Sequence, residues 1–138
     1  MAYAGDLRPA EAWAMLEEEP AAQLIDVRTR PEWAFVGVPD LDRIGKRPAF
    51  VSWQVYPTMQ ANPTFADEVQ QVAPSTEVPL LFICRSGARS RSAAEAMTAL
   101  GFRRCYNVAE GFEGHSDSDR HRGRQDGWKA AGLPWVQD

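Results

Sequence analysis

LLFICRSGARSRSAAEAM, residues 80–97, is the most informative segment of this 138-residue chain. Apolar residues lead up to Cys84, a short loop of small and basic residues follows, and an alanine-rich segment continues to Met97. The unbroken apolar run predicts a strand covered on both faces, over residues 78–84. The segment after the loop predicts a helix over residues 88–102, closed by Gly101. We therefore expect Cys84 at the junction of a buried strand and a helix.

Strand and helix patterns alternate along the rest of the chain. Residues 22–27 (AQLIDV) and 103–108 (RRCYNV) have the apolar character of further strands. The other expected elements are helices over 8–20 and 62–73, a short helix over 28–35, a strand over 49–57 and a last helical turn over 128–135. We expect Pro9 in the first turn of its helix, and Asn62 as the cap of the next one with Pro63 at its first position.

The alternation predicts one α/β domain over residues 1–138, with a central, mostly parallel sheet flanked by helices on both faces. One segment does not fit either pattern. GFEGHSDSDRHRGRQDG, residues 111–127, is polar and has no periodicity. It predicts a long loop, and loops of that length in small domains are often functional.

Composition excludes several classes of protein. A hydrophobic content of 44% is enough for a core, and a net charge of −4 argues against general nucleic-acid binding. No apolar stretch reaches the roughly 18 residues of a membrane span, and the N-terminus lacks the pattern of a signal peptide. The two cysteines, Cys84 and Cys105, fit neither a disulfide framework nor a zinc spacing. We expect a cytoplasmic protein with no membrane or nucleic-acid partner.

The loop after Cys84 has the properties of an anion cradle. Its backbone N–H groups can converge on one point, and the start of a helix adds partial positive charge there. Such surroundings favour a thiolate, which is the nucleophilic form of cysteine. Cysteine ending an apolar strand is often only a core residue. The glycine and the flanking arginines favour catalysis over that structural alternative. The candidate site is Cys84 with Arg85, Ser86, Gly87, Ala88, Arg89 and Ser90.

The sequence CRSGARS resembles the active-site loop of the rhodanese family of sulfurtransferases. Three other segments resemble the family: LIDVRTRPEW, CYNVAEGFEG and GWKAAGLPW. Together they extend the similarity over about residues 6–136. One departure is FVGVPDL, which replaces a family motif that contains a histidine.

The resemblance implies a mechanism. Cys84 would attack the outer sulfur of a donor such as thiosulfate or a persulfide and become a persulfide itself. Cyanide, a thiol or a protein acceptor would then remove that sulfur. The loop N–H groups would hold the persulfide, Arg89 would close the loop and Arg85 would help to bind the anionic donor. The resemblance implies no metal and no organic cofactor.

Related phosphatases and arsenate reductases carry a loop that is one residue longer. This chain has four residues between Cys84 and Arg89, which is the sulfurtransferase spacing. Two further alternatives are a sulfur carrier that acts with a protein partner and a non-enzymatic regulatory domain. The intact cysteine loop argues against the regulatory alternative.

Other residues have weaker claims to a functional role. Asp26 and Arg28 match the Asp-Val-Arg of the family, and we expect them to support the site rather than react, with Arg28 paired to Asp26 or Glu32. Cys105 begins its strand, so a parallel sheet places it far from Cys84.

His115 and His121, the only histidines, lie with aspartates in a spacing that matches no metal site. We expect this polar loop at the active-site rim, where Arg120, Arg122 and Arg124 would favour anionic substrates. Trp33, Trp53, Trp128 and Trp135 are expected in packing roles.

Overall fold

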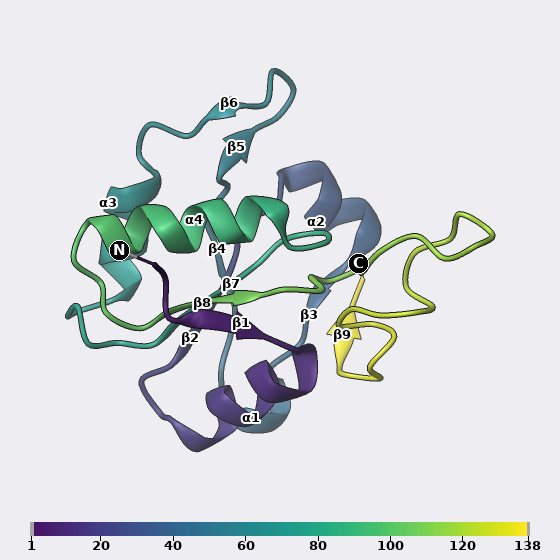
Figure 1. The fold of residues 1–138 in the computed structure, drawn as a ribbon, viewed down its shortest axis with the longest axis horizontal. Helices are drawn as coiled ribbons and strands as arrows, with labels where there is room; N and C mark the ends of the chain where they lie inside the picture. The colour runs from purple at the N-terminus through teal and green to yellow at the C-terminus, as the bar shows by residue number, and fades with distance from the viewer. Residues whose placement is uncertain (1, 138) are drawn as a thin grey trace.

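The computed structural model describes residues 2–137, in which strands and helices alternate along the chain (Figure 1). The elements are β1 (Gly5–Leu7), α1 (Pro9–Glu18), β2 (Gln23–Asp26), α2 (Arg30–Val36), β3 (Val38–Pro39), the 3-10 turn η1 (Asp42–Ile44), β4 (Ala49–Phe50), β5 (Gln54–Val55), β6 (Gln60–Ala61), α3 (Phe65–Val72), β7 (Leu80–Ile83), α4 (Ala88–Ala99), β8 (Cys105–Val108) and β9 (Trp135–Val136).

Five strands form one parallel sheet in the order β1-β8-β7-β2-β4. The central strand β7 pairs with β2 on one side and with β8 on the other, so Phe82 lies opposite both Ile25 and Asn107. All four residues of β7 are buried, which accounts for its unbroken apolar sequence. The sheet confirms the predicted α/β fold.

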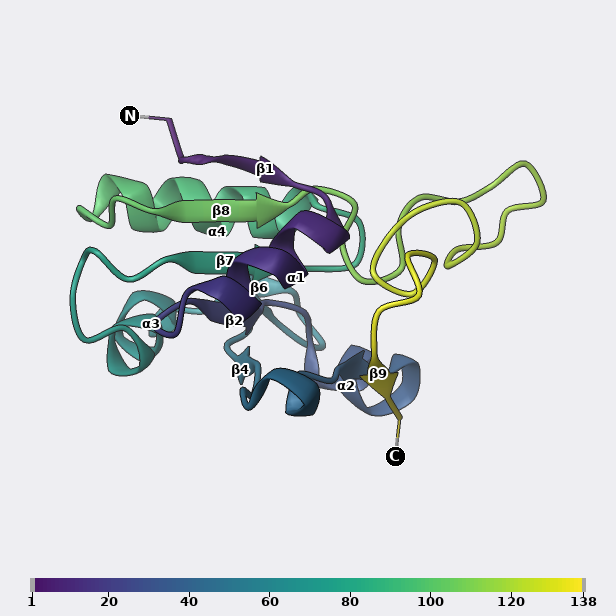
Figure 2. The ribbon, with the colours of Figure 1, turned by 90° about the horizontal axis from the view of Figure 1, so that it is seen from below.

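The helices cover both faces of the sheet. Figure 2 shows α1 and α4 on opposite sides of the strands. Ala12 and Leu16 of α1 pack with Leu81 and Ile83 on one face. On the other face, α3 and α4 pack on a second apolar cluster that contains Phe82. The carboxyl ends of the strands meet at one edge of this two-sided core, and Cys84 follows β7 there.

Several predicted element boundaries were wrong. The polar strand β1 was not predicted, because its three residues carry no apolar run and it depends on pairing with β8. The strand expected over 49–57 is only β4, followed by the small antiparallel hairpin β5–β6. Helix α3 begins at Phe65 instead of near Asn62, because the Asn62 side chain accepts bonds from the backbone N–H and hydroxyl of Thr64.

The C-terminal segment also differs from its prediction. Residues 109–134 contain turns but no helix or strand, in agreement with the loop predicted over 111–127. The helical turn expected over 128–135 is not a helix: the turn ends at Gly132, and Trp135 pairs with Pro39 in the antiparallel β3–β9 pair. In Figure 1 the long loop projects beyond the carboxyl edge of the sheet. Among residues 2–137, no helix is long and apolar enough to cross a membrane.

Candidate active site

The loop between β7 and α4 turns sharply around Cys84. Gly87 is the N-cap of α4 and has a φ of 109°, in the left-handed region where side chains are strained. A Cβ atom at this position would overlap the carbonyl oxygen of Ala109. The glycine of the loop is therefore required by both the turn and the close approach of the segment that follows β8.

Two backbone N–H groups point at the sulfur of Cys84. The N–H of Gly87 lies 3.1 Å from Sγ and that of Ser90 lies 3.4 Å from it. The hydroxyl oxygen of Ser90 is a third polar neighbour at 3.2 Å. The cysteine itself is only 1% exposed. The start of α4 therefore offers two donors, together with its helix dipole, to negative charge on a shielded sulfur.

The stem of the polar loop holds the cysteine loop in place. The N–H of Phe112 donates to the carbonyl of Cys84 at 2.8 Å, and the N–H groups of Glu113 and Gly114 donate to the carbonyl of Arg85. Gly111 lies so close to this backbone that a Cβ would overlap Arg85 and Ser86. These contacts place the beginning of the 111–127 loop against the candidate site. This agrees with the expectation that the loop lies at the rim of the site.

Arg89 is tied to α2. Its guanidinium donates to both carboxylate oxygens of Glu32, at 2.7 and 2.9 Å. Burial raises the pKa of Glu32, but the bonds and charge of Arg89, with bonds from Thr29, outweigh it and hold the pKa at about 2. The same carboxylate raises the pKa of Arg89. Arg89 thus joins the start of α4 to α2, and both terminal nitrogens of its guanidinium are bonded to Glu32.

The other loop residues surround this arrangement. Arg85 and Ala88 are exposed, while Ser86 is half-buried. Among residues 2–137, Arg85 makes no salt bridge, so its cation faces solvent. Arg85, which was expected to help bind an anionic donor, therefore has an unpaired guanidinium, whereas that of Arg89 is paired with Glu32.

Asp26 and Arg28 form a fully buried ion pair beneath the site. Arg28 donates to both oxygens of Asp26 and to the carbonyl of Gly37. The guanidinium also lies 4.3 Å from the ring centre of Phe112. Of the two partners considered from the sequence, Asp26 is paired to Arg28, whereas Glu32 is paired to Arg89. The pair joins β2, α2 and the stem of the polar loop, which is a supporting role.

Cys105 lies at the opposite end of the sheet from Cys84. It pairs in register with Leu80, the first residue of β7, whereas Cys84 follows the last. Burial raises the pKa of the Cys105 thiol. The two cysteines are both free, and the register keeps them apart.

The histidines do not form a metal site. His115 contacts Asp126 through its ring at 2.8 Å, and the backbone N–H of His121 donates to Asp117. In the described part of the chain, no three His, Cys, Asp or Glu side chains form a group able to hold a metal ion. These aspartates stabilise turns of the loop.

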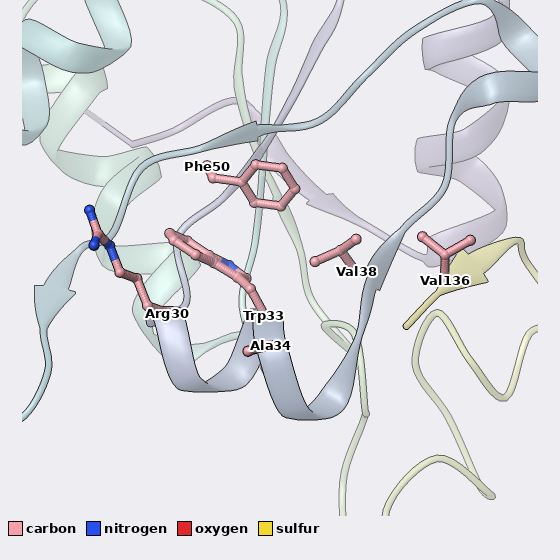
Figure 3. A pocket seen from close by; sticks show the side chains of 6 residues that line it. All are labelled: Arg30, Trp33, Ala34, Val38, Phe50 and Val136. Carbon is pink, nitrogen blue, oxygen red and sulfur yellow. The ribbon is translucent and has the colours of Figure 1, made fainter. Parts of the chain in front are cut away.

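The tryptophans occupy different environments. Trp128 is fully buried, and its ring N–H donates to the carbonyl of Pro134. Trp53 packs edge-on against Phe65. Trp33 instead lines a hollow of about 420 Å³ next to α2. Figure 3 shows Trp33 and Phe50 facing each other, with Arg30 at one end of this hollow.

Three polar residues near the site, Glu32, Asn107 and Asp6, were not among the candidate site residues. Glu32 belongs to a motif quoted above, but its partner Arg89 is 57 residues away. Asn107 accepts a hydrogen bond from Ser90, and its amide in turn donates to Asp6. The sequence offered one indication of the contacts among Asn107, Ser90 and Asp6: an asparagine at a position of β8 that faces the core.

The chain resembles several known proteins. The crystal structure of Rv0390 from Mycobacterium tuberculosis is 47% identical and covers 99% of this chain and 100% of that one, with a TM-score of 0.91. An uncharacterised RP600 homologue of Rickettsia rickettsii is 39% identical over 91% of each chain. The thiosulfate sulfurtransferase GlpE of Actinobacillus pleuropneumoniae is 29% identical over 94% of this chain and 90% of the relative.

A family described as the STR4 middle domain matches residues 5–138, nearly the whole chain. The parallel sheet, the position of Cys84 and the similarity to GlpE agree with the resemblance inferred from the loop sequence. The protein therefore belongs to the STR4 middle-domain family and is a rhodanese-like domain of the sulfurtransferase family.

Proposed function

We propose that the protein transfers sulfane sulfur through a persulfide on Cys84. The observation that carries this proposal is the convergence of the Gly87 and Ser90 N–H groups on a cysteine sulfur at the start of α4. Such donors stabilise a negative charge on sulfur, which the thiolate carries before transfer and the persulfide carries after it. The similarity to GlpE supports thiosulfate as the donor.

The chemistry balances in two steps. The Cys84 thiolate attacks the outer sulfur of thiosulfate, a new S–S bond forms, and sulfite leaves with the electrons of the broken bond. An acceptor such as cyanide or a thiolate then attacks the outer sulfur of the persulfide and restores the Cys84 thiolate. Arg85, with its exposed cation, is suited to attract the anionic donor to this loop.

The first experiment is intact-mass measurement after incubation with thiosulfate. The wild type should gain one sulfur atom, and Cys84→Ser should gain none. Addition of cyanide should return the wild type to its original mass and release thiocyanate. Persistence of the unmodified mass in the wild type, under conditions that load a known thiosulfate sulfurtransferase, would contradict the proposal.

A carrier that receives sulfur from a protein is a second candidate, and the surface around α2 favours it. Among residues 2–137, seven of the eight exposed large apolar side chains lie on α2, β4, the β5–β6 hairpin or β9: Phe35, Phe50, Val55, Tyr56, Met59, Trp135 and Val136. Exposed apolar side chains gathered in this way are typical of protein-binding surfaces. Arg30 adds a cation, so the expected partner presents apolar side chains beside a carboxylate.

Loading from two donors separates the carrier from the enzyme. A carrier should be loaded quickly by a protein that bears a cysteine persulfide and slowly by thiosulfate. Phe50→Ser should slow the first reaction only, whereas Leu100→Ser, at an exposed apolar position at the far end of α4, should slow neither. Equal effects of the two substitutions would exclude this surface from docking.

A further inference from the structure

Asn107 is a polar side chain in an apolar layer. It lies on β8 between Cys105 and the carboxyl edge of the sheet, on the face that α4 covers, and it is only 3% exposed. Its neighbour in register on β7 is Phe82, a member of the apolar cluster on that face. Buried amides remain in proteins where all their hydrogen bonds are satisfied. One partner of this amide, Ser90, also contacts the sulfur of Cys84.

The direction of each hydrogen bond in this group is fixed by chemistry. Asp6 has a carboxylate that only accepts, and it lies 3.2 Å from the Asn107 Nδ2 atom. The amide therefore turns its Oδ1 atom toward Ser90, whose hydroxyl donates to it at 2.6 Å. A serine hydroxyl has one proton, so the proton of Ser90 is committed to Asn107.

This commitment determines what Ser90 offers to Cys84. The two side-chain atoms are 3.2 Å apart, and with its proton directed at Asn107 the Ser90 oxygen can only accept. When Cys84 is a thiol, its S–H can therefore only donate to the Ser90 oxygen. A thiolate would instead face a lone pair of that oxygen, unless the hydroxyl turned away from Asn107 and toward the sulfur.

We propose that Asn107 is a positioning residue that, through Ser90, controls whether the hydroxyl beside Cys84 can donate a hydrogen bond to the sulfur. The Ser90 hydroxyl has two alternative acceptors: Asn107 while the cysteine is a thiol, and the sulfur once the proton has left or a persulfide has formed. The cost of turning the hydroxyl opposes the Gly87 and Ser90 N–H groups, which favour the thiolate.

Asp6 is the charged group that is hydrogen-bonded to Asn107, whereas the exposed Arg85 of the loop itself makes no hydrogen bond to this amide in the described chain. Arg89 and its partner Glu32 lie on the α2 side, and Asp26 lies at the end of β2. On the β1 side, Asp6 is exposed and also accepts a bond from Tyr3 at 2.7 Å. The hydroxyl of Ser90 is therefore the component that an Asn107 substitution changes.

The test measures the rate of Cys84 alkylation by iodoacetamide as a function of pH, with Cys105→Ala as the background so that one thiol reacts. Asn107→Leu frees the Ser90 hydroxyl to donate to the thiolate. We expect the midpoint of the profile to fall by about one pH unit, since a hydrogen bond to the charged form favours that form. In a Ser90→Ala background, which has no hydroxyl to release, the same substitution should cause no shift.

A surface substitution gives the second measurement, because Asn107→Leu alters a buried position. Asp6→Ala removes the carboxylate that orients the amide. The Asn107 amide can then reverse and donate to Ser90, whose proton becomes available to the sulfur. This variant should lower the midpoint in the same direction, again only when Ser90 is present.

Equal shifts with and without Ser90, or an unchanged midpoint in both Asn107→Leu and Asp6→Ala, would overturn the inference. The inference rests on the proposed function only in taking Cys84 as the nucleophile. Alkylation needs no sulfur donor, so its outcome is independent of thiosulfate loading. Loading that fails while the Ser90-dependent shift is present would reject the proposed function and leave the positioning role of Asn107 intact.

Discussion

The two edges of the sheet surround a buried cysteine with different hydrogen-bonding groups. Cys84 and Cys105 are each 1% exposed, and both belong to the apolar cluster beneath α4. At the carboxyl edge, the start of α4 directs two N–H groups at Cys84. At the other edge, the Cys105 thiol donates to the carbonyl of Phe102 at 4.0 Å, and burial raises the pKa of this thiol. The two cysteines are therefore equally buried, and what differs between them is the end of α4 that each lies near.

Replacement of each cysteine in turn by serine should give the largest difference between the two edges. Cys84→Ser should abolish persulfide loading from thiosulfate, because no other thiol meets a donor-rich loop. Cys105→Ser should load at the wild-type rate. Intact mass after thiosulfate treatment measures both variants. Loading of Cys105 in the Cys84→Ser protein would show that the two edges do not differ as the geometry indicates.

The two glycines that flank α4 give the next largest effect. Gly87→Ala places a Cβ against Ala109 at a φ of 109°, so the loop must shift away from the sulfur. We expect a loss of stability of about 2–3 kcal/mol and a loading rate that is roughly 100-fold lower, since a displacement near 1 Å has that effect on reacting groups.

Gly101 is the matched control at the other end of the helix. Its φ is 102°, but a Cβ there meets no atom within 4 Å. Gly101→Ala should therefore cost about 1 kcal/mol in urea unfolding and leave loading unchanged. If both variants lost loading to the same extent, backbone strain rather than crowding of the cysteine loop would be the cause.

Each edge also carries a bidentate arginine–glutamate pair, and the two should differ in strength. Arg89 and Glu32 are about one-fifth exposed, whereas Arg104 and Glu19 are more than one-third exposed. The pKa of Glu32 is lowered from 4.5 to about 2, which corresponds to a stabilisation of about 3 kcal/mol. This contribution is complete above pH 4.5 and is lost as the pH falls toward 2, because the unfolded state takes up the proton first.

Urea unfolding of two variants at pH 7 and at pH 2–3 measures this difference. Glu32→Gln should destabilise the protein strongly at neutral pH and much less at the acid end. Glu19→Gln should cost less than about 1 kcal/mol at pH 7, as expected of an exposed pair. A Glu32→Gln effect that does not decrease with acid would mean that the carboxylate charge contributes nothing.

Much of this organisation was predictable because local patterns determine it. The apolar run of β7, the glycine at Gly87 and the alanine-rich α4 each follow from neighbours in the sequence. They were sufficient to predict the parallel sheet and the position of the cysteine loop. The short strand β1 depends on pairing with β8, in which Asp6 lies opposite Asn107, and no local pattern specifies a contact between residues so far apart in the sequence.

The same distinction separates the site residues that were found from those that were missed. Residues 84–90 are contiguous, so their chemistry could be inferred from one loop. Glu32 and Asn107 reach that loop only through tertiary packing, from α2 and β8. Arg89 was expected to close the loop, yet its partner Glu32 could be assigned only once α2 was placed beside α4.

The long loop at the carboxyl edge has no counterpart at the other edge, and its arginines should have the smallest effect. Arg122 is held by the carbonyl of Gly114 in the stem, while Arg120 and Arg124 are exposed. Exposed charges act on an approaching anion through a screened field, so Arg120→Ser with Arg124→Ser should raise the thiosulfate KM only about twofold at low salt. The difference should vanish near 0.5 M salt, where the Debye length falls to roughly 4 Å. Arg85→Ser, beside the sulfur, should raise KM more and keep part of its effect in salt. A KM that responds equally to both changes would place the loop arginines in direct contact with the donor.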